Sequence, residues 1–177
     1  MPVEPLMPSV ARNVGGRTGD LEHDLRVWLE GAGKVVVAGI RNGIRRDDFA
    51  GVKVAQDLVG RVSGNVHLIE CETVPESFVD EIIEIRPTHV LLVDAALLGL
   101  SPGAAHLYDV EEVVNSTSIS THTLPLRVFC EYVFTLTGAK IALLLIEPLE
   151  TDFGEGLSLE LKGAAERVVM ALSDVLP

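Results

Sequence analysis

The sequence predicts an α/β fold, a three-layer sandwich in which a mostly parallel, twisted sheet of about five strands carries helices on both faces. Two observations lead to this prediction. Short, continuous apolar runs such as KVVVAGI (34–40) and IALLLI (141–146) alternate along the chain with segments of helical periodicity. Continuous apolar strands are typical of parallel sheets that are covered on both faces. With 177 residues and no internal repeat, the chain fits one such domain.

The start of the chain is predicted to be a leader followed by one amphipathic helix. The leader contains three prolines and a GGRTG segment, which favour a flexible stretch. The helix is expected over 20–31, with Asp20 as its N-cap and Gly31 or Gly33 as its stop. One face of it would carry Leu21, Leu25, Trp28 and Leu29. We therefore divide the chain into 1–33, the flexible leader plus this helix, and 34–177, a single α/β domain.

From Lys34 onward, strands and helices are predicted to alternate. Strands are expected at 34–40, 65–70, 88–98, 105–110 and 140–148, because each is a short run rich in apolar residues. Helices are expected at 48–62, 75–86, 125–138 and 158–176. The first of these helices would pack Val52, Ala55 and Val59 on one side, and the second would use Phe78, Ile82 and Ile85.

Composition limits the possible functions. The formal net charge of −12 repels phosphate backbones, and no basic stripe offsets it, so nucleic-acid binding is not expected. The apolar runs are too short to cross a bilayer, and no signal segment opens the chain, so we expect no membrane insertion and a cytoplasmic location. Cys71 and Cys130 lack C-x-x-C spacing and are expected to be reduced structural thiols.

Four residues, in three places near strand ends or helix starts, are candidates for catalysis or metal binding. In a sheet of this kind, ligands bind outside the carboxyl ends of the strands. Asp47 and Asp48 follow the first strand and either cap the next helix or face the cleft; because consecutive helical residues diverge by about 100°, they cannot both do the same job. Asp94 ends a buried strand, where a carboxylate needs a cation or donors. His122 lies in a polar loop before a helix.

Asp48, Asp94 and His122 would form an open three-ligand site for a divalent transition metal if they converged at one sheet edge. Their separations along the chain carry no spacing signature, and each residue has a structural alternative: a helix cap, a carboxylate held by backbone N–H groups, or a loop histidine without a role. The other histidines, His23, His67, His89 and His106, are interpreted as structural or surface residues.

Four segments of the chain form a recognisable set: GIRNGIRRDDFAG (39–51), RPTHVLLVDAALLGLSPG (86–103), STHTLPL (120–126) and IEPL (146–149). Together they resemble the nickel–iron hydrogenase maturation endopeptidases, and most closely the HycI type, which serves hydrogenases associated with formate hydrogenlyase. The most specific of these segments is the strand ending in VDA and followed by G-L-x-P-G.

The resemblance implies a function and a site. Family members remove a short C-terminal extension from the precursor of the hydrogenase large subunit once nickel has been inserted. The metal-binding positions of the family fall on Asp48, Asp94 and His122, with Asp47 and Asn42 as supporting residues, Asp47 orienting the loop or capping the helix. The nickel would be carried by the precursor itself, and other divalent transition metals could substitute for it.

The expected mechanism is metal-assisted hydrolysis of a peptide bond. The chain has no H-E-x-x-H motif, no G-x-S-x-G nucleophile elbow and no recognisable cysteine–histidine signature. A divalent ion can polarise the scissile carbonyl or lower the pKa of a water, while a carboxylate takes the proton. We expect Asp48, Asp94 and His122 to share these duties.

Two departures from the family pattern bear on the site. Arg41 stands where the family has the second glycine of a G-x-G-N turn, and Phe49 stands where it often has a glycine after two aspartates. A side chain at either position would distort the loop if the backbone there needed a positive φ. Arg41 could also lower the pKa of Asp48 and compete with the metal.

Two other functions fit the sequence less well. A chaperone could bind the nickel-loaded precursor without cutting it. A nucleotide-binding regulatory domain could use GIRNG after the first strand and Glu70 or Glu72 after the second. However, the G-x-G-x-x-G and G-K-[ST] motifs that such domains use for phosphates are absent.

Overall fold

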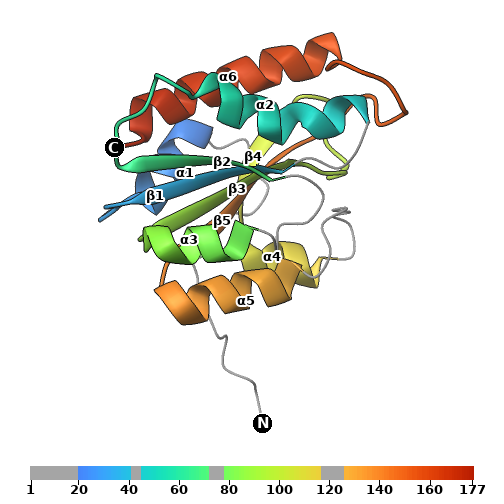
Figure 1. Cartoon of the computed structure of the whole chain (residues 1–177). Coiled ribbons are helices and arrows are strands. Elements are labelled where there is room, and N and C mark those ends of the chain that lie inside the picture. The colour runs from blue at the N-terminus through green and yellow to red at the C-terminus, as the bar shows by residue number, and fades with distance from the viewer. Residues whose placement is uncertain (1–19, 41–44, 72–77, 117–125) are drawn as a thin grey trace.

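The computed structural model describes residues 20–40, 45–71, 78–116 and 126–177, and it has the predicted three-layer α/β fold (Figure 1). Its sheet has five strands in the order β2-β1-β3-β5-β4. β1, β2, β3 and β5 are parallel, whereas β4 pairs with β5 in the antiparallel sense at one edge. The strands are β1 (Val35–Ile40), β2 (Val66–Cys71), β3 (His89–Ala95), β4 (Ala105–Asp109) and β5 (Lys140–Ile146).

Helices cover both faces of the sheet. On one face lie α1 (Leu21–Trp28), α2 (Ala50–Asp57) and α6 (Leu159–Val175), and on the other lie α3 (Val79–Ile85), α4 (Val110–Asn115) and α5 (Leu126–Thr137) (Figure 1). A short 3-10 helix, η1 (Arg46–Phe49), precedes α2. None of the helices in the described ranges is both long and apolar enough to cross a membrane.

Alternate residues of the strands contribute to two separate hydrophobic cores, one on each face of the sheet. Val36 and Ala38 of β1 pack with α3, α4 and α5, whereas Val35 and Val37 pack with α1, α2 and α6. The strands are apolar throughout because both faces are buried, which confirms the reasoning that predicted the fold class.

The predicted helix at the start of the chain is part of this structure. Asp20 caps α1 by accepting a hydrogen bond from Glu22 N at 3.1 Å, as expected. Leu25 and Trp28 are buried in the core that α1 shares with α6. The helix ends at Trp28, three residues earlier than predicted. The division of the chain at residue 33 stays a prediction, but α1 packs on its own sheet.

One detail of the predicted elements is wrong, and one short helix was missed. Val59 does not face the core: α2 ends at Asp57, and the Val59 side chain is 70% exposed. Helix α4 was not predicted. It is short, and Asp109 and Glu112 start it with a reciprocal capping box. Its two buried residues, Val110 and Val113, are too few to give a clear helical period.

Candidate functional site

Buried carboxylates gather at the carboxyl edge of the parallel strands. In the described part of the chain, the acidic side chains that are buried are Asp47, Asp48, Asp94 and Glu147. Asp47 and Asp48 follow β1, Asp94 lies near the end of β3, and Glu147 directly follows β5. Since these three strands are adjacent and parallel, their ends meet at one edge. This is the edge where sheets of this class bind ligands.

Asp94 is buried at the end of the central strand. Its Oδ1 accepts a hydrogen bond from Ala95 N at 2.8 Å, so the carboxylate is partly held by backbone, as the structural alternative suggested. Burial raises the pKa of Asp94 well above its ordinary value, the bond from Ala95 opposes this rise, and the nearby Asp48 carboxylate adds to it. The charge of Asp48 thus acts on Asp94, so both carboxylates belong to this edge of the sheet.

A close contact between backbones brings Asp48 to this edge. A Cβ atom on Gly51, in the first turn of α2, would lie 2.1 Å from Val93 O, and one on Gly39 of β1 would lie 2.2 Å from Gly51 O. Only glycine allows α2 to approach the sheet so closely. Because Val93 precedes Asp94, this contact fixes the start of α2 against the strand end that carries Asp94.

Asp47 has a different role from Asp48, as expected, although it does not cap its own helix. The cap residues of η1 and α2, Arg45 and Phe49, make no side-chain capping hydrogen bond. Asp47 instead accepts hydrogen bonds from a distant segment: from the backbone N–H groups of Leu149, Glu150 and Ser158, at 2.7 to 2.9 Å, and from the Ser158 hydroxyl at 2.9 Å. Asp47 thus ties the residues beside Asp48 to the loop before α6.

Phe49 fits its position without strain. Its backbone has φ −80° and ψ −9°, which any L-residue can adopt. Phe49 in place of a family glycine therefore does not distort the chain here. Arg41, the other departure, and Asn42, the predicted supporting residue, lie outside the described residues, and so does His122.

Glu147 is a buried acid that the sequence analysis did not single out. Its Oε2 accepts hydrogen bonds from Leu98 N at 2.6 Å and from Leu100 N at 3.3 Å. Its backbone also bonds to Gly103 N and Ala104 O, both at 2.8 Å. Glu147 therefore holds the loop that follows Asp94. The signal that pointed to Asp94, a charge at the end of a continuous apolar strand, was present here too.

The three-ligand hypothesis stays a prediction. Asp48 and Asp94 are both buried at the carboxyl edge and their charges interact, and oxygen donors of this kind suit divalent ions. Within the described ranges, no group of three His, Cys, Asp or Glu side chains is placed to hold a metal ion. The third member, His122, is outside those ranges, so convergence of all three stays a prediction.

The surroundings of the two cysteines and of the buried His89 indicate structural roles. Cys71 and Cys130 are free and buried, and burial, with smaller effects from Glu81 and Glu131, raises the pKa of each thiol to about 12. Thiols with such pKa values are poor nucleophiles. His89 is buried between the carbonyl of Trp28, 3.0 Å from Nε2, and the Thr88 hydroxyl, 2.9 Å from Nδ1. Both observations agree with the structural interpretation of these residues.

Comparison with known proteins identifies the family. The family model HycI, hydrogenase maturation protease, matches residues 52–175. The chain belongs to the hydrogenase maturation proteases. The matched span contains Asp94 and His122 and begins after Asp48. Family membership makes the chain an endopeptidase, and it disfavours the nucleotide-binding alternative.

Relatives and solved structures agree with membership of the hydrogenase maturation proteases. A Methanocaldococcus jannaschii protein named as a candidate hydrogenase maturation protease is 34% identical over 157 residues, 84% of this chain and 91% of that protein. The hydrogenase 3 maturation protease of Escherichia coli K12 is 29% identical over 77% of this chain and 87% of its own. The crystal structure of HycI from Thermococcus kodakarensis superposes with a TM-score of 0.77 at 34% identity, covering 84% and 95% of the two chains.

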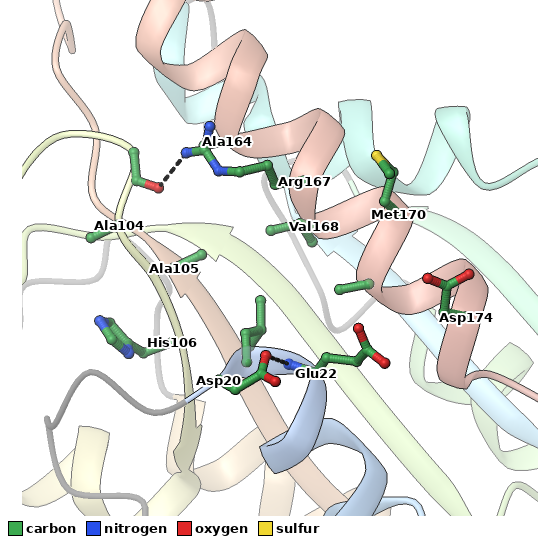
Figure 2. A pocket seen from close by; sticks show the side chains of 13 residues that line it. Asp20, Glu22, Ala104, Ala105, His106, Ala164, Arg167, Val168, Met170 and Asp174 are labelled. Atoms are coloured by element: carbon green, nitrogen blue, oxygen red, sulfur yellow. Dashed lines mark hydrogen bonds between the residues drawn. The ribbon is translucent and has the colours of Figure 1, made fainter.

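This hydrogenase maturation protease also has a groove away from the carboxylate edge. It lies between α1, β4 and α6 and has a volume of about 740 Å³ (Figure 2). Three of its charged side chains have partners nearby. Asp20 caps α1, Glu22 pairs with Arg26, and Arg167 donates a hydrogen bond to Gly103 O at 3.5 Å. Neither Asp48 nor Asp94 lines it. The groove is therefore separate from the carboxylate edge.

Proposed function

We propose that this protein is a HycI-type endopeptidase that removes the C-terminal extension of a [NiFe]-hydrogenase large-subunit precursor after nickel insertion. The observation that carries the proposal is the pair of buried, interacting carboxylates, Asp48 and Asp94, at the ligand-binding edge of a chain that belongs to the family. Two carboxylates whose charges interact repel each other, and a divalent cation bound between them would relieve the repulsion.

The nickel held by the precursor is part of the substrate in this proposal, and Asp48, Asp94 and His122 would bind it. A divalent ion at such a site supplies Lewis acidity toward the scissile carbonyl or toward a water. Burial raises the pKa of Asp94, which makes its carboxylate a better acceptor for a proton released during hydrolysis. Asp47 would keep the adjacent Asp48 in place through its bonds to the 149–158 segment.

The test is incubation of the purified protein with nickel-loaded and nickel-free precursor from the same source, read by mass spectrometry. We expect the loaded precursor alone to shorten. Asp48→Asn, Asp94→Asn and His122→Ala are each expected to reduce cleavage by at least about a hundredfold, because each removes one member of a cooperating set. Full activity of all three variants would remove the site from the proposal.

The same experiment also tests the non-cleaving chaperone function that the sequence alone left open. A chaperone would bind the loaded precursor and leave its mass unchanged. We place the protein in the cytoplasm, where the two buried free thiols would stay reduced.

A further inference from the structure

Exposed apolar side chains concentrate around the candidate site. Single exposed leucines are normal on a protein surface, but five of the eleven large exposed apolar side chains in the described ranges lie in two segments at the carboxyl edge: the loop after β3, and the stretch from the end of β5 to the first residue of α6. The loop after β3 contributes Leu97 and Leu100, and the segment after β5 contributes Leu149, Phe153 and Leu159. We call these five residues the apolar rim. Phe153 and Leu159 are the most exposed, at 76% and 82%.

The first loop of the rim is held in place by Glu147. Its buried carboxylate accepts the N–H groups of Leu98 and Leu100, and its backbone bonds to Gly103 and Ala104 on the far side of the loop. Buried carboxylates are costly unless such donors satisfy them, so the loop conformation is strongly fixed. Leu97 and Leu100 are therefore presented to solvent by a rigid support.

The second segment is held by the residues next to Asp48. Asp47 accepts the N–H groups of Leu149, Glu150 and Ser158. Arg45 forms an isolated antiparallel bridge with Phe153 and lies over its ring, 5.2 Å from the centroid. Arg46 forms an ion pair with Glu150. The same short stretch that carries Asp48 thus positions the apolar side chains of the second segment, so the rim lies at the edge of the sheet where the buried Asp48 and Asp94 side chains are found.

The charge of the second segment points to the character of a partner. Residues 149–160 contain four acids, Glu150, Asp152, Glu155 and Glu160, and no lysine or arginine. Of these acids Asp152, Glu155 and Glu160 are exposed. An apolar surface with acidic neighbours is complementary to a chain segment that carries apolar side chains beside basic ones.

We propose that the apolar rim docks the polypeptide substrate next to the scissile bond, through a segment of apolar and basic residues. This inference rests on the proposed endopeptidase function and extends it to substrate recognition. Apolar anchors that surround a reacting centre fix a flexible chain in register with that centre. Loss of an anchor should therefore weaken substrate binding more than the chemical step.

The test compares rim variants with matched variants elsewhere on the full-length protein. Phe153→Ser and Leu159→Ser remove exposed rim side chains and should leave the fold intact. Val128→Ser and Tyr132→Ser remove exposed side chains of α5, which covers the face of the sheet opposite to α6 (Figure 1). With nickel-loaded precursor, each rim variant should raise KM about tenfold with kcat nearly unchanged, and the α5 variants should match the wild type.

The outcomes separate this inference from the proposed function. If the wild type cleaves and the rim variants keep its KM, the docking surface is wrong while the protease function stands. If the wild type does not cleave, the protease function is wrong, and the Kd of the precursor decides the inference: rim variants must bind about tenfold more weakly than the α5 variants. If rim variants change only self-association in sedimentation, the rim joins two copies of this chain, and the inference fails.

A second arm tests the charge of the docked segment. The double variant Asp152→Asn/Glu155→Gln should raise KM severalfold at low ionic strength, and the difference should disappear at high salt because screening removes the attraction. An unchanged or lowered KM at low salt would overturn the assignment of basic residues to the docked segment.

Discussion

At the scale of single residues, Asp94 is placed where its charge is unfavourable. It is buried, its only hydrogen bond among those described comes from Ala95 N, and the Asp48 carboxylate lies close by. A group in this position stabilises binding of a cation and destabilises the fold without one. The Asp94 carboxylate therefore favours cation binding but lowers the stability of the protein without a cation.

We predict that Asp94→Asn increases the free energy of unfolding at neutral pH while it abolishes cleavage. The amide keeps the oxygen that accepts from Ala95, and it removes both the buried charge and the repulsion with Asp48, a gain of roughly 1–3 kcal/mol. Urea denaturation of metal-free protein measures the gain. Asp80→Asn, at an exposed position on α3, is the control and should change stability little. A destabilised Asp94→Asn protein would contradict this interpretation.

His89 gives the fold a pH dependence. Burial lowers its pKa, the Lys140 charge lowers it further, and the bond to the Trp28 carbonyl opposes both. The folded pKa is thus below the unfolded value of about 6.5. The unfolded chain then binds more protons below that value, so the stability that neutral His89 contributes is present above about pH 6.5 and is lost as pH falls toward the folded pKa.

We therefore predict that the stability advantage of the wild type over His89→Gln shrinks between about pH 7 and pH 5, by at most about 1.4 kcal/mol per pH unit. Denaturant midpoints across this range measure it. His23→Gln, on the exposed surface of α1, is the control for loss of a surface histidine and should leave the denaturant midpoint at pH 7 near that of the wild type. A constant offset for His89→Gln would show that the residue does not titrate in this way.

At the scale of elements, the approach of α2 to the sheet positions the site. Gly39 and Gly51 remove two side chains from the contact between β1, β3 and α2, so that the helix start lies against the end of β3. Asp48, just before α2, and Asp94, near the end of β3, are thereby brought to the same edge of the sheet from elements that are far apart in sequence.

Gly51→Ala is predicted to destabilise the protein by about 1–3 kcal/mol and to reduce cleavage strongly, because a Cβ 2.1 Å from Val93 O forces α2 away from Asp94. Urea denaturation and precursor cleavage measure the two effects. Gly64→Ala is the matched control: a Cβ there meets no atom within 4 Å, so both quantities should stay near wild type. Normal cleavage by a folded Gly51→Ala protein would show that this contact does not place Asp48.

Much of the arrangement of elements was predictable because it depends on local pattern. Continuous apolar runs identified the strands, and their parallel order brought Asp48 and Asp94 to one edge. Contacts between segments distant in sequence were not predictable. Asp47 looked like a helix cap, but its partners are 102 to 111 residues away. Gly51 is unremarkable in sequence, since its importance comes from a carbonyl of another strand.

At the scale of the whole molecule, α1 belongs to the same cooperative unit as the sheet. Leu25 and Trp28 are buried with side chains of α6 and β5 in one core. The Trp28 carbonyl lies 3.0 Å from His89 Nε2, and the two rings meet edge to face at 5.1 Å. The first helix is therefore tied to the central strand by packing and by a buried polar contact.

Whether α1 unfolds together with the sheet can be tested with the single tryptophan of the chain. Trp28 fluorescence reports on α1, while far-ultraviolet circular dichroism reports on all elements. We predict that the two signals give the same denaturation midpoint, as in a two-state domain. Leu25→Ala, which leaves a cavity in the shared core, should lower both midpoints together by about 2–5 kcal/mol of stability, whereas Val27→Ala at a more exposed site should lower them little. A fluorescence transition that precedes the dichroism transition would mean that α1 detaches from a sheet that remains folded without it.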